Sequence, residues 1–169
     1  MPPVAVIVGP PGAGKTTVGR LLAQRLGEQF RDTDADVEAS MGRTVADIFV
    51  ADGEAVFREA ERAAVAVALR DHDGVLALGG GAVLDDATRS VLRDHTVVFL
   101  SVELPDAAER VGFNRNRPLL MGNPRAQWKE LAEQREPLYA GIASVRVATD
   151  GLTPEQVVDE VQTALGSLQ

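Results

Sequence analysis

The segment at residues 9–16, Gly-Pro-Pro-Gly-Ala-Gly-Lys-Thr, constrains the fold of this chain more than any other feature. It fits the phosphate-binding pattern G-x-x-x-x-G-K-[ST] at every fixed position, and that pattern lies between a buried strand and a helix. The surrounding sequence agrees, because apolar, β-branched residues 4–8 precede the segment and an amphipathic pattern follows it as far as Gly27. The sequence therefore predicts a strand, a phosphate-binding loop and a helix at the start of a βαβ unit.

The residue types of this loop indicate what it binds. Its glycines let successive backbone N–H groups turn toward phosphate oxygens, and the helix that starts there adds the positive end of its dipole. Lys15 would reach the outer phosphates, and the hydroxyl of Thr16 would ligate Mg²⁺. The residues of this loop predicted to bind a nucleoside triphosphate are Gly12, Ala13, Gly14, Lys15, Thr16 and Thr17.

Strand and helix patterns alternate along the rest of the chain. Extended segments are predicted at residues 29–34, 75–78, 96–102 and 144–148, and helices at 35–41, 45–50, 54–71, 85–94, from 105, at 125–135 and after Thr153. This alternation predicts a three-layer α/β domain around a mostly parallel sheet, occupying residues 1–169. Residues 112–124 are polar and aperiodic, which is typical of a functional lid or of a disordered linker.

Composition excludes several classes of protein. The 17 basic and 25 acidic residues give a net charge of −8, which opposes non-specific binding to nucleic acid. Without cysteine there are no disulfides, thiolate metal sites or cysteine nucleophiles, and no apolar run reaches the length of a membrane span. We therefore expect a cytoplasmic protein, monomeric by default, that binds small molecules rather than nucleic acid or membrane.

Two further patterns narrow the phosphate-binding class. A signalling GTPase needs the base-reading pattern N-K-x-D, and the nearest sequence, residues 114–117, lacks the Asp. A mechanical ATPase would carry an acidic residue after an apolar strand, but residues 75–78 lead instead into three glycines. Glycine at a strand end leaves room for a ligand to approach the backbone closely. A small-molecule kinase is the remaining class.

Asp32 and Asp34 are the candidate acidic groups of such a kinase. At positions i and i+2 of an extended segment, both carboxylates would face the crevice at the carboxyl end of the sheet. Mg²⁺ beside Asp32 would relieve their repulsion, and Asp34 would be left to accept a proton from an incoming hydroxyl. An acidic turn with Asp34 as a helix N-cap is the alternative.

Six motifs, in order, resemble those of the bacterial shikimate kinases, and the resemblance runs over nearly the whole chain. They are GPPGAGKTT at residues 9–17, DTD at 32–34, FR at 57–58, LGGGAV at 78–83, NRPL at 116–119 and REPLY at 135–139. The resemblance implies transfer of a phosphoryl group from ATP to the 3-hydroxyl of shikimate, in aromatic amino-acid synthesis. It also implies a five-stranded parallel sheet, as in nucleoside monophosphate kinases, with a lid at residues 112–124 and a substrate-binding helical region at about 34–60.

The resemblance assigns the acceptor site. It implies that Arg58 and Arg135 hold the carboxylate of shikimate, a task suited to the planar guanidinium group. It places Asp34 on the hydroxyls and the backbone of Gly79, Gly80 and Gly81 against the ring. From spacing alone, Arg58 fits a solvated helical ion pair and Arg135 fits a cation near a helix C-terminus.

The resemblance also assigns the nucleotide and metal site. Asp32 would join Thr16 at Mg²⁺, Arg117 would reach the ATP phosphates, and Arg110 and Pro118 would flank the adenine. Family members often carry a basic residue shortly before the last helix, and residues 149–154 contain none. A kinase of another polyol acid, such as gluconate, and a nucleotide-binding module without catalysis are the alternatives.

Overall fold

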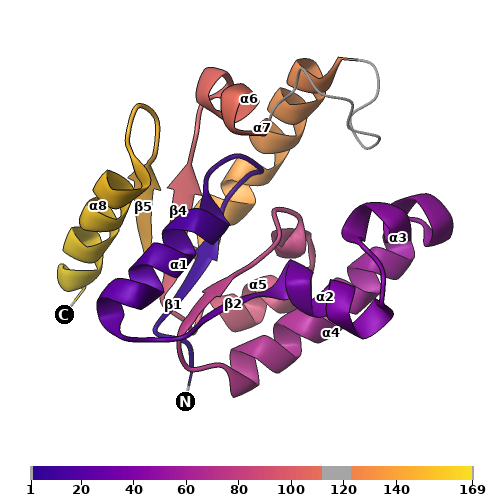
Figure 1. Ribbon diagram of the computed structural model, residues 1–169, viewed down its shortest axis with the longest axis horizontal. Helices are drawn as coiled ribbons and strands as arrows, with labels where there is room; N and C mark the ends of the chain where they lie inside the picture. The colour runs from indigo at the N-terminus through magenta and orange to yellow at the C-terminus, as the bar shows by residue number, and fades with distance from the viewer. Residues whose placement is uncertain (1, 112–122, 169) are drawn as a thin grey trace.

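A computed structural model describes residues 2–111 and 123–168 and contains one five-stranded parallel sheet (Figure 1). The strands lie in the order β2-β3-β1-β4-β5, and each pair of neighbours is parallel. The strands are β1 (Ala5–Val8), β2 (Phe30–Asp32), β3 (Val75–Ala77), β4 (Val97–Ser101) and β5 (Val145–Ala148). The predicted five-stranded α/β fold is confirmed.

Helices fill the connections between the strands. They are α1 (Lys15–Leu26), α2 (Thr33–Met41), α3 (Val45–Asp52), α4 (Glu54–Asp71), α5 (Asp86–Leu92), α6 (Leu104–Val111), α7 (Pro124–Ile142) and α8 (Pro154–Gly166), with a short 3₁₀ helix at Ala82–Leu84. Among the described residues, none of these helices is both long enough and apolar enough to cross a membrane.

The central strand β1 is buried on both faces and alternates between two hydrophobic cores. Ala5 and Ile7 pack into the core under α1 and α8, whereas Val6 and Val8 pack into the core under α4, α5 and α7. A smaller cluster of Val37, Ile48 and Phe57 joins α2, α3 and α4, which lie together at one end of the sheet (Figure 1). The continuous apolar run of the strand follows from this double burial.

The extended segment predicted at residues 29–34 is shorter than expected. β2 ends at Asp32, whose carboxylate accepts the backbone N–H of Asp34 at 2.9 Å and so caps α2. Asp34 therefore lies in the first turn of a helix, and the predicted strand alternation of Asp32 and Asp34 is wrong. The N-cap is also Asp32 rather than Asp34, because an N-cap carboxylate accepts from a residue that follows it.

The helix predicted at residues 125–135 is also wrong in its end point. α7 continues through Pro137 to Ile142, so Arg135 lies in the helix interior rather than near a C-terminus. Pro137 removes one backbone donor, but it is exposed, and Tyr139 and Ile142 on the following turn are buried. Tertiary packing of that turn outweighs the local preference of proline to end a helix.

The start of the last helix agrees with its sequence. The hydroxyl of Thr153 accepts the N–H of Gln156 at 3.2 Å, and the side chain of Gln156 accepts the N–H of Thr153 at 2.9 Å. Pro154 occupies the first turn. These two bonds form a capping box, and the helix predicted after Thr153 is confirmed.

Candidate active site

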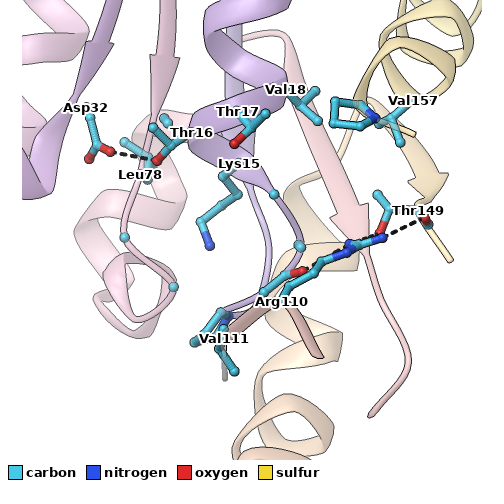
Figure 2. Close-up of a pocket in the computed structure, with 18 of the residues that line it drawn as sticks. Lys15, Thr16, Thr17, Val18, Asp32, Leu78, Arg110, Val111, Thr149 and Val157 are labelled. Atoms are coloured by element: carbon cyan, nitrogen blue, oxygen red, sulfur yellow. Dashed lines mark hydrogen bonds between the residues drawn. The ribbon is translucent and has the colours of Figure 1, made fainter. Parts of the chain in front are cut away.

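A cleft of about 690 Å³ opens at the carboxyl ends of the strands, beside the loop between β1 and α1 (Figure 2). The phosphate loop, both aspartates of the predicted acidic pair and the start of the glycine triplet line it. Ligands of open α/β sheets bind at this edge, where the loops leave the parallel strands. Most residues predicted from the phosphate-binding motif are therefore brought together.

The phosphate loop has the backbone conformation that its glycines permit. Gly12 and Gly14 both have φ of +87°, which disfavours any residue with a side chain, and Gly14 is the N-cap of α1. The side chain of Lys15 points into the cleft (Figure 2), where its Nζ donates to the carbonyls of Gly9 at 2.8 Å and Pro10 at 3.1 Å. The N–H of Ala13 donates to Pro10 at 3.2 Å, so this predicted phosphate donor is used within the loop.

Desolvation in the cleft lowers the pKa of Lys15 to about 8, although the carboxylates of Asp34 and Asp32 oppose that shift. The two carboxylates thus favour the charged form of the ammonium group, which needs an anion to replace lost water. A lysine in this state suits an outer phosphate of a nucleotide.

Thr16 and Asp32 form the site that fits a divalent cation. The Thr16 hydroxyl donates to Oδ2 of Asp32 at 3.0 Å (Figure 2). Within the described part of the chain, no three His, Cys, Asp or Glu residues cluster as a complete metal cage. Two hard oxygen ligands fit Mg²⁺, which commonly takes one or two protein ligands and completes its shell with water and phosphates.

Asp34 is placed as a proton acceptor. Its Oδ1 is buried and has no hydrogen-bond partner among residues 2–111 and 123–168. Burial raises the pKa of Asp34 to about 6, and the neighbouring carboxylates of Asp32 and Glu61 add to the increase, against Lys15. A carboxylate with a pKa near the working pH, and with a free buried oxygen, is suited to general base chemistry.

Arg58 pairs with two glutamates of its own helix and lies against Gly81 of the glycine triplet. Its Nη1 donates to Oε1 of Glu61 at 2.8 Å, and its Nε lies 3.5 Å from Glu54. The ion pairs expected along the helix are thus present, but the Arg58 side chain is only 21% exposed and that of Glu61 only 4%. The guanidinium group is therefore held in place beside the cleft rather than solvated.

Arg135 joins this group from α7. It is buried, and its Nε has no hydrogen-bond partner among the described residues. Burial raises the pKa of Glu61, and the charges of Arg58 and Arg135 oppose that increase. A second arginine with an unused donor beside Arg58 gives a site that an anion can complete.

The glycine triplet packs directly on these side chains. A Cβ added to Gly79 would lie 2.6 Å from Oδ1 of Asp34, and one added to Gly81 would lie 2.5 Å from Cζ of Arg58. The Tyr139 hydroxyl donates to the carbonyl of Gly80 at 2.6 Å and so fixes the turn. Burial raises the pKa of this phenol to about 12, which keeps it a donor at neutral pH.

The sequence reasoning missed Glu61 and Tyr139 as supports of the site. Glu61 follows Arg58 by three residues on one helix, a spacing that pairs opposite charges, so the signal was present but was assigned to the surface. Tyr139 belongs to the REPLY motif, where only the arginine received a role. Their burial could not be read from the sequence.

Arg110 lies on the opposite side of the phosphate loop. Its guanidinium group donates to the carbonyl of Gly12 at 3.0 Å, the hydroxyl of Thr149 at 2.9 Å and the carbonyl of Thr149 at 3.0 Å (Figure 2). Leu152, Pro154 and Val157 complete this end of the cleft, and the sequence reasoning had not singled them out. Arg110 thus brings a positive charge to the segment 149–154 that has none of its own.

Two predicted site residues, Arg117 and Pro118, lie outside the described residues, as does most of the predicted lid at 112–124. Arg58 and Arg135, which were predicted to bind the substrate, do not line the main cleft. Arg58 lies against Gly81, and Arg135 is close enough to Glu61 for its charge to act on that carboxylate.

Comparison with known proteins gives consistent matches. The family model described as shikimate kinase matches residues 11–166. A shikimate kinase of Salinispora tropica is 61% identical over 167 residues, which cover 99% of this chain and 100% of that protein.

Solved structures extend the likeness to three dimensions. Shikimate kinase from Acinetobacter baumannii in complex with shikimate has a TM-score of 0.93 and 34% identity, covering 100% of this chain and 95% of that one. A gluconokinase from Sinorhizobium meliloti has a TM-score of 0.58 and 21% identity, covering 99% and 93%. The second match shows a shared fold and no more.

Proposed function

This chain belongs to the shikimate kinase family, and from that premise we propose how its own residues perform the reaction. It is an ATP-dependent kinase that transfers the γ-phosphoryl group of ATP to the 3-hydroxyl of shikimate, giving shikimate 3-phosphate and ADP. The observation that carries the residue assignment is the packing of Asp34 and Arg58 against the glycine triplet, with the buried Arg135 acting together with Arg58 on Glu61.

The phosphate loop would hold the nucleotide by charge and by backbone donors. Lys15 would exchange its two loop carbonyls for phosphate oxygens, which are stronger partners for an ammonium group. Thr16 and Asp32 would hold Mg²⁺ through their oxygens. When bound, Mg²⁺ would offset negative charge on the phosphates.

The acceptor would bind through its carboxylate and its hydroxyls. Arg58, held by Glu61, and the buried Arg135 would bind the shikimate carboxylate, which supplies an acceptor for the unpartnered Nε of Arg135. The free Oδ1 of Asp34 would accept the proton of the 3-hydroxyl, or orient it, as the oxygen attacks the γ-phosphorus. Gly79, Gly80 and Gly81 would let the ring approach because no side chain stands there.

Further parts of the proposal rest on the family resemblance. Arg110 and Pro118 would flank the adenine, and Arg117 would reach the phosphates from a lid at residues 112–124. We propose that residues 1–169 work as one domain, with a substrate-binding region at about 34–60, and that the enzyme is a cytoplasmic monomer requiring Mg²⁺. Catalysis would consist of positioning and electrostatic stabilisation without a covalent intermediate.

A coupled ADP-release assay with ATP and Mg²⁺ tests the function, comparing shikimate, gluconate and no acceptor. We expect ADP release that depends on shikimate, at about 1–100 turnovers per second, as is normal for kinases. Release with gluconate alone would overturn the acceptor assignment and keep the kinase class. Nucleotide binding without ADP release on either acceptor would indicate a nucleotide-binding module without catalysis.

Replacing Gly81 with Ala should weaken the acceptor site selectively. The new Cβ would overlap the guanidinium group of Arg58, which would have to shift away from its place beside Glu61. Losing one hydrogen bond to a charged group costs about 1.5–3 kcal/mol, so KM for shikimate should rise roughly tenfold or more. Steady-state kinetics with each substrate varied in turn would measure this rise against an unchanged KM for ATP.

Gly141→Ala is the matched control, because a Cβ at this helical position meets nothing within 4 Å. It should leave both KM values unchanged and should not destabilise the protein, since alanine favours helix more than glycine does. An unchanged KM for shikimate in Gly81→Ala would remove Arg58 from the acceptor site.

A further inference from the structure

Four successive carbonyl groups of the phosphate loop, those of residues 9–12, accept hydrogen bonds from side chains. Lys15 donates to Gly9 and Pro10 from within the motif, as described above. The next two carbonyls are held from outside it: Pro11 accepts from the indole Nε1 of Trp128 at 2.8 Å, and Gly12 accepts from Arg110. A phosphate would draw Lys15 away from its carbonyls, but the indole carries no charge and has no reason to leave.

Trp128 is built into the core behind the loop. It lies in the second turn of α7, is 5% exposed, and belongs to the hydrophobic core that contains Ala107 and Ala108 of α6. The loop rests on the same surface, because a Cβ added to Gly12 would lie 3.1 Å from Cα of Ala107. The indole N–H therefore reaches the loop from a rigid base.

The hydrogen bond that sets the direction of the Pro11 carbonyl also sets the direction of the next N–H, that of Gly12. In a planar trans peptide the C=O of one residue and the N–H of the next point in opposite directions. A carbonyl of Pro11 held toward α7 thus leaves the N–H of Gly12 pointing away from α7. That N–H has no hydrogen bond within residues 2–111 and 123–168, and Gly12 lines the nucleotide cleft.

The hydrogen bond lies in partly buried surroundings, between the buried indole and the carbonyl of an exposed loop residue. Trp128 sets the orientation of the peptide between Pro11 and Gly12. Gly12 has a φ of +87°, and without this hydrogen bond its conformational freedom would let that peptide rotate.

We propose that Trp128 is a positioning residue of this kinase, and that its indole N–H orients the peptide between Pro11 and Gly12 so that the Gly12 N–H faces the nucleotide phosphates. Trp128 touches no substrate in this account. A donor pre-aimed by the protein does not have to be ordered when the nucleotide binds, and this saving appears as affinity.

The test removes the N–H while keeping the ring. Trp128 is the only tryptophan of the chain, so 3-benzothienylalanine, which replaces the N–H with sulfur, can be introduced at that position alone. ADP affinity, measured by calorimetry with Mg²⁺, should fall about three- to tenfold, the usual net effect of one hydrogen bond. Trp128→Phe should show the same direction of change. KM for ATP should rise with it, whereas kcat and KM for shikimate should stay near the values of the unmodified enzyme, because a contact made in ground and transition states alike acts on binding.

Leu131→Ala, an exposed truncation on the same helix, is the control and should leave ADP affinity unchanged. A lower melting temperature with unchanged ADP affinity, in both the benzothienyl and Phe proteins, would show a core-packing role only and overturn the proposal. Equal increases of both KM values would also overturn it. Calorimetry with ADP needs no acceptor, so this test stands apart from the identity of the phosphorylated substrate.

Discussion

Replacing Asp34 with Asn is expected to lower kcat by about 10²–10⁴, the usual contribution of a positioned general base, while ADP affinity and the fold are kept. Asn is close to Asp in size, so the first turn of α2 and the contact with Gly79 would survive. What is lost is the ionised oxygen that receives the hydroxyl proton. Coupled ADP release and ADP calorimetry on the same preparation would measure the two effects separately.

The pH profile gives this variant a second signature. Because the pKa of Asp34 is raised to about 6, the wild-type kcat/KM should fall about tenfold per pH unit below pH 6, where the carboxyl becomes protonated. Asn has no proton to gain, so this acidic limb should disappear from the residual activity of the variant.

The raised pKa of Asp34 also determines whether the Asp34→Asn substitution raises or lowers the stability of the folded protein. Since the folded state raises the pKa, Asp34 contributes stability that is fully present below the ordinary value of 3.8 and lost as the pH rises through 6. The melting temperature of the Asp34→Asn variant at pH 7 should therefore be no lower than that of the wild-type protein. Asp36→Asn, on the same helix and paired with Arg31, should retain full turnover and serves as the control. Turnover within a factor of ten of wild type in Asp34→Asn would exclude Asp34 as the base.

Replacing Lys15 with Met is expected to lower kcat/KM for ATP by about 10²–10³, the loss typical of one electrostatic donor in an active site. The ammonium group is the charged group of the phosphate loop that points into the cleft, and Met keeps the length of the side chain without its charge. The same change removes a positive charge near Asp34 that holds the pKa of that carboxyl down. The acidic limb of the residual activity should therefore move above pH 6.

Stability should move in the opposite direction to activity. Desolvation lowers the pKa of Lys15 to about 8, so the fold disfavours its charged form and stability is lost as the pH falls through that value. Met escapes this penalty at pH 7, and the free energy of unfolding, from urea titration, should not decrease. Lys129→Met removes the other lysine of the chain, an exposed one paired with Glu133, and should change neither quantity. An unaltered kcat/KM in Lys15→Met would contradict the proposed role.

Segments whose function depends on neighbours in the chain were predictable. The phosphate loop carries its glycines, lysine and threonine in one run, so the sequence displays the whole unit together with the strand and helix that hold it. The capping box at Thr153 is local in the same sense. Two local predictions failed. The N-cap of α2 is Asp32, whose carboxylate accepts the N–H of Asp34, and not Asp34 itself. Tertiary packing of the turn after Pro137 continues α7 to Ile142.

The acceptor site, in contrast, is assembled from residues that lie far apart in the sequence. The family resemblance named Arg58 and Arg135, but their spacing in the sequence fits surface cations equally well. Only the packing of α4 and α7 buries Arg135, leaves the Arg58 side chain 21% exposed, and adds Glu61 and Tyr139 behind the glycine turn.

By itself, the sequence determined the parallel α/β class and the triphosphate loop, because each follows from residues within one or two turns of each other. The charged groups of the acceptor site were named by the family resemblance and not by their spacing. The tertiary structure decided how those groups are used. The free oxygen of Asp34, the lowered pKa of Lys15 and the hydrogen bond from Trp128 to Pro11 each depend on burial among segments far apart in the chain. Desolvation and hydrogen-bond direction are properties of three-dimensional surroundings, so no pattern of residue types along the chain contains them.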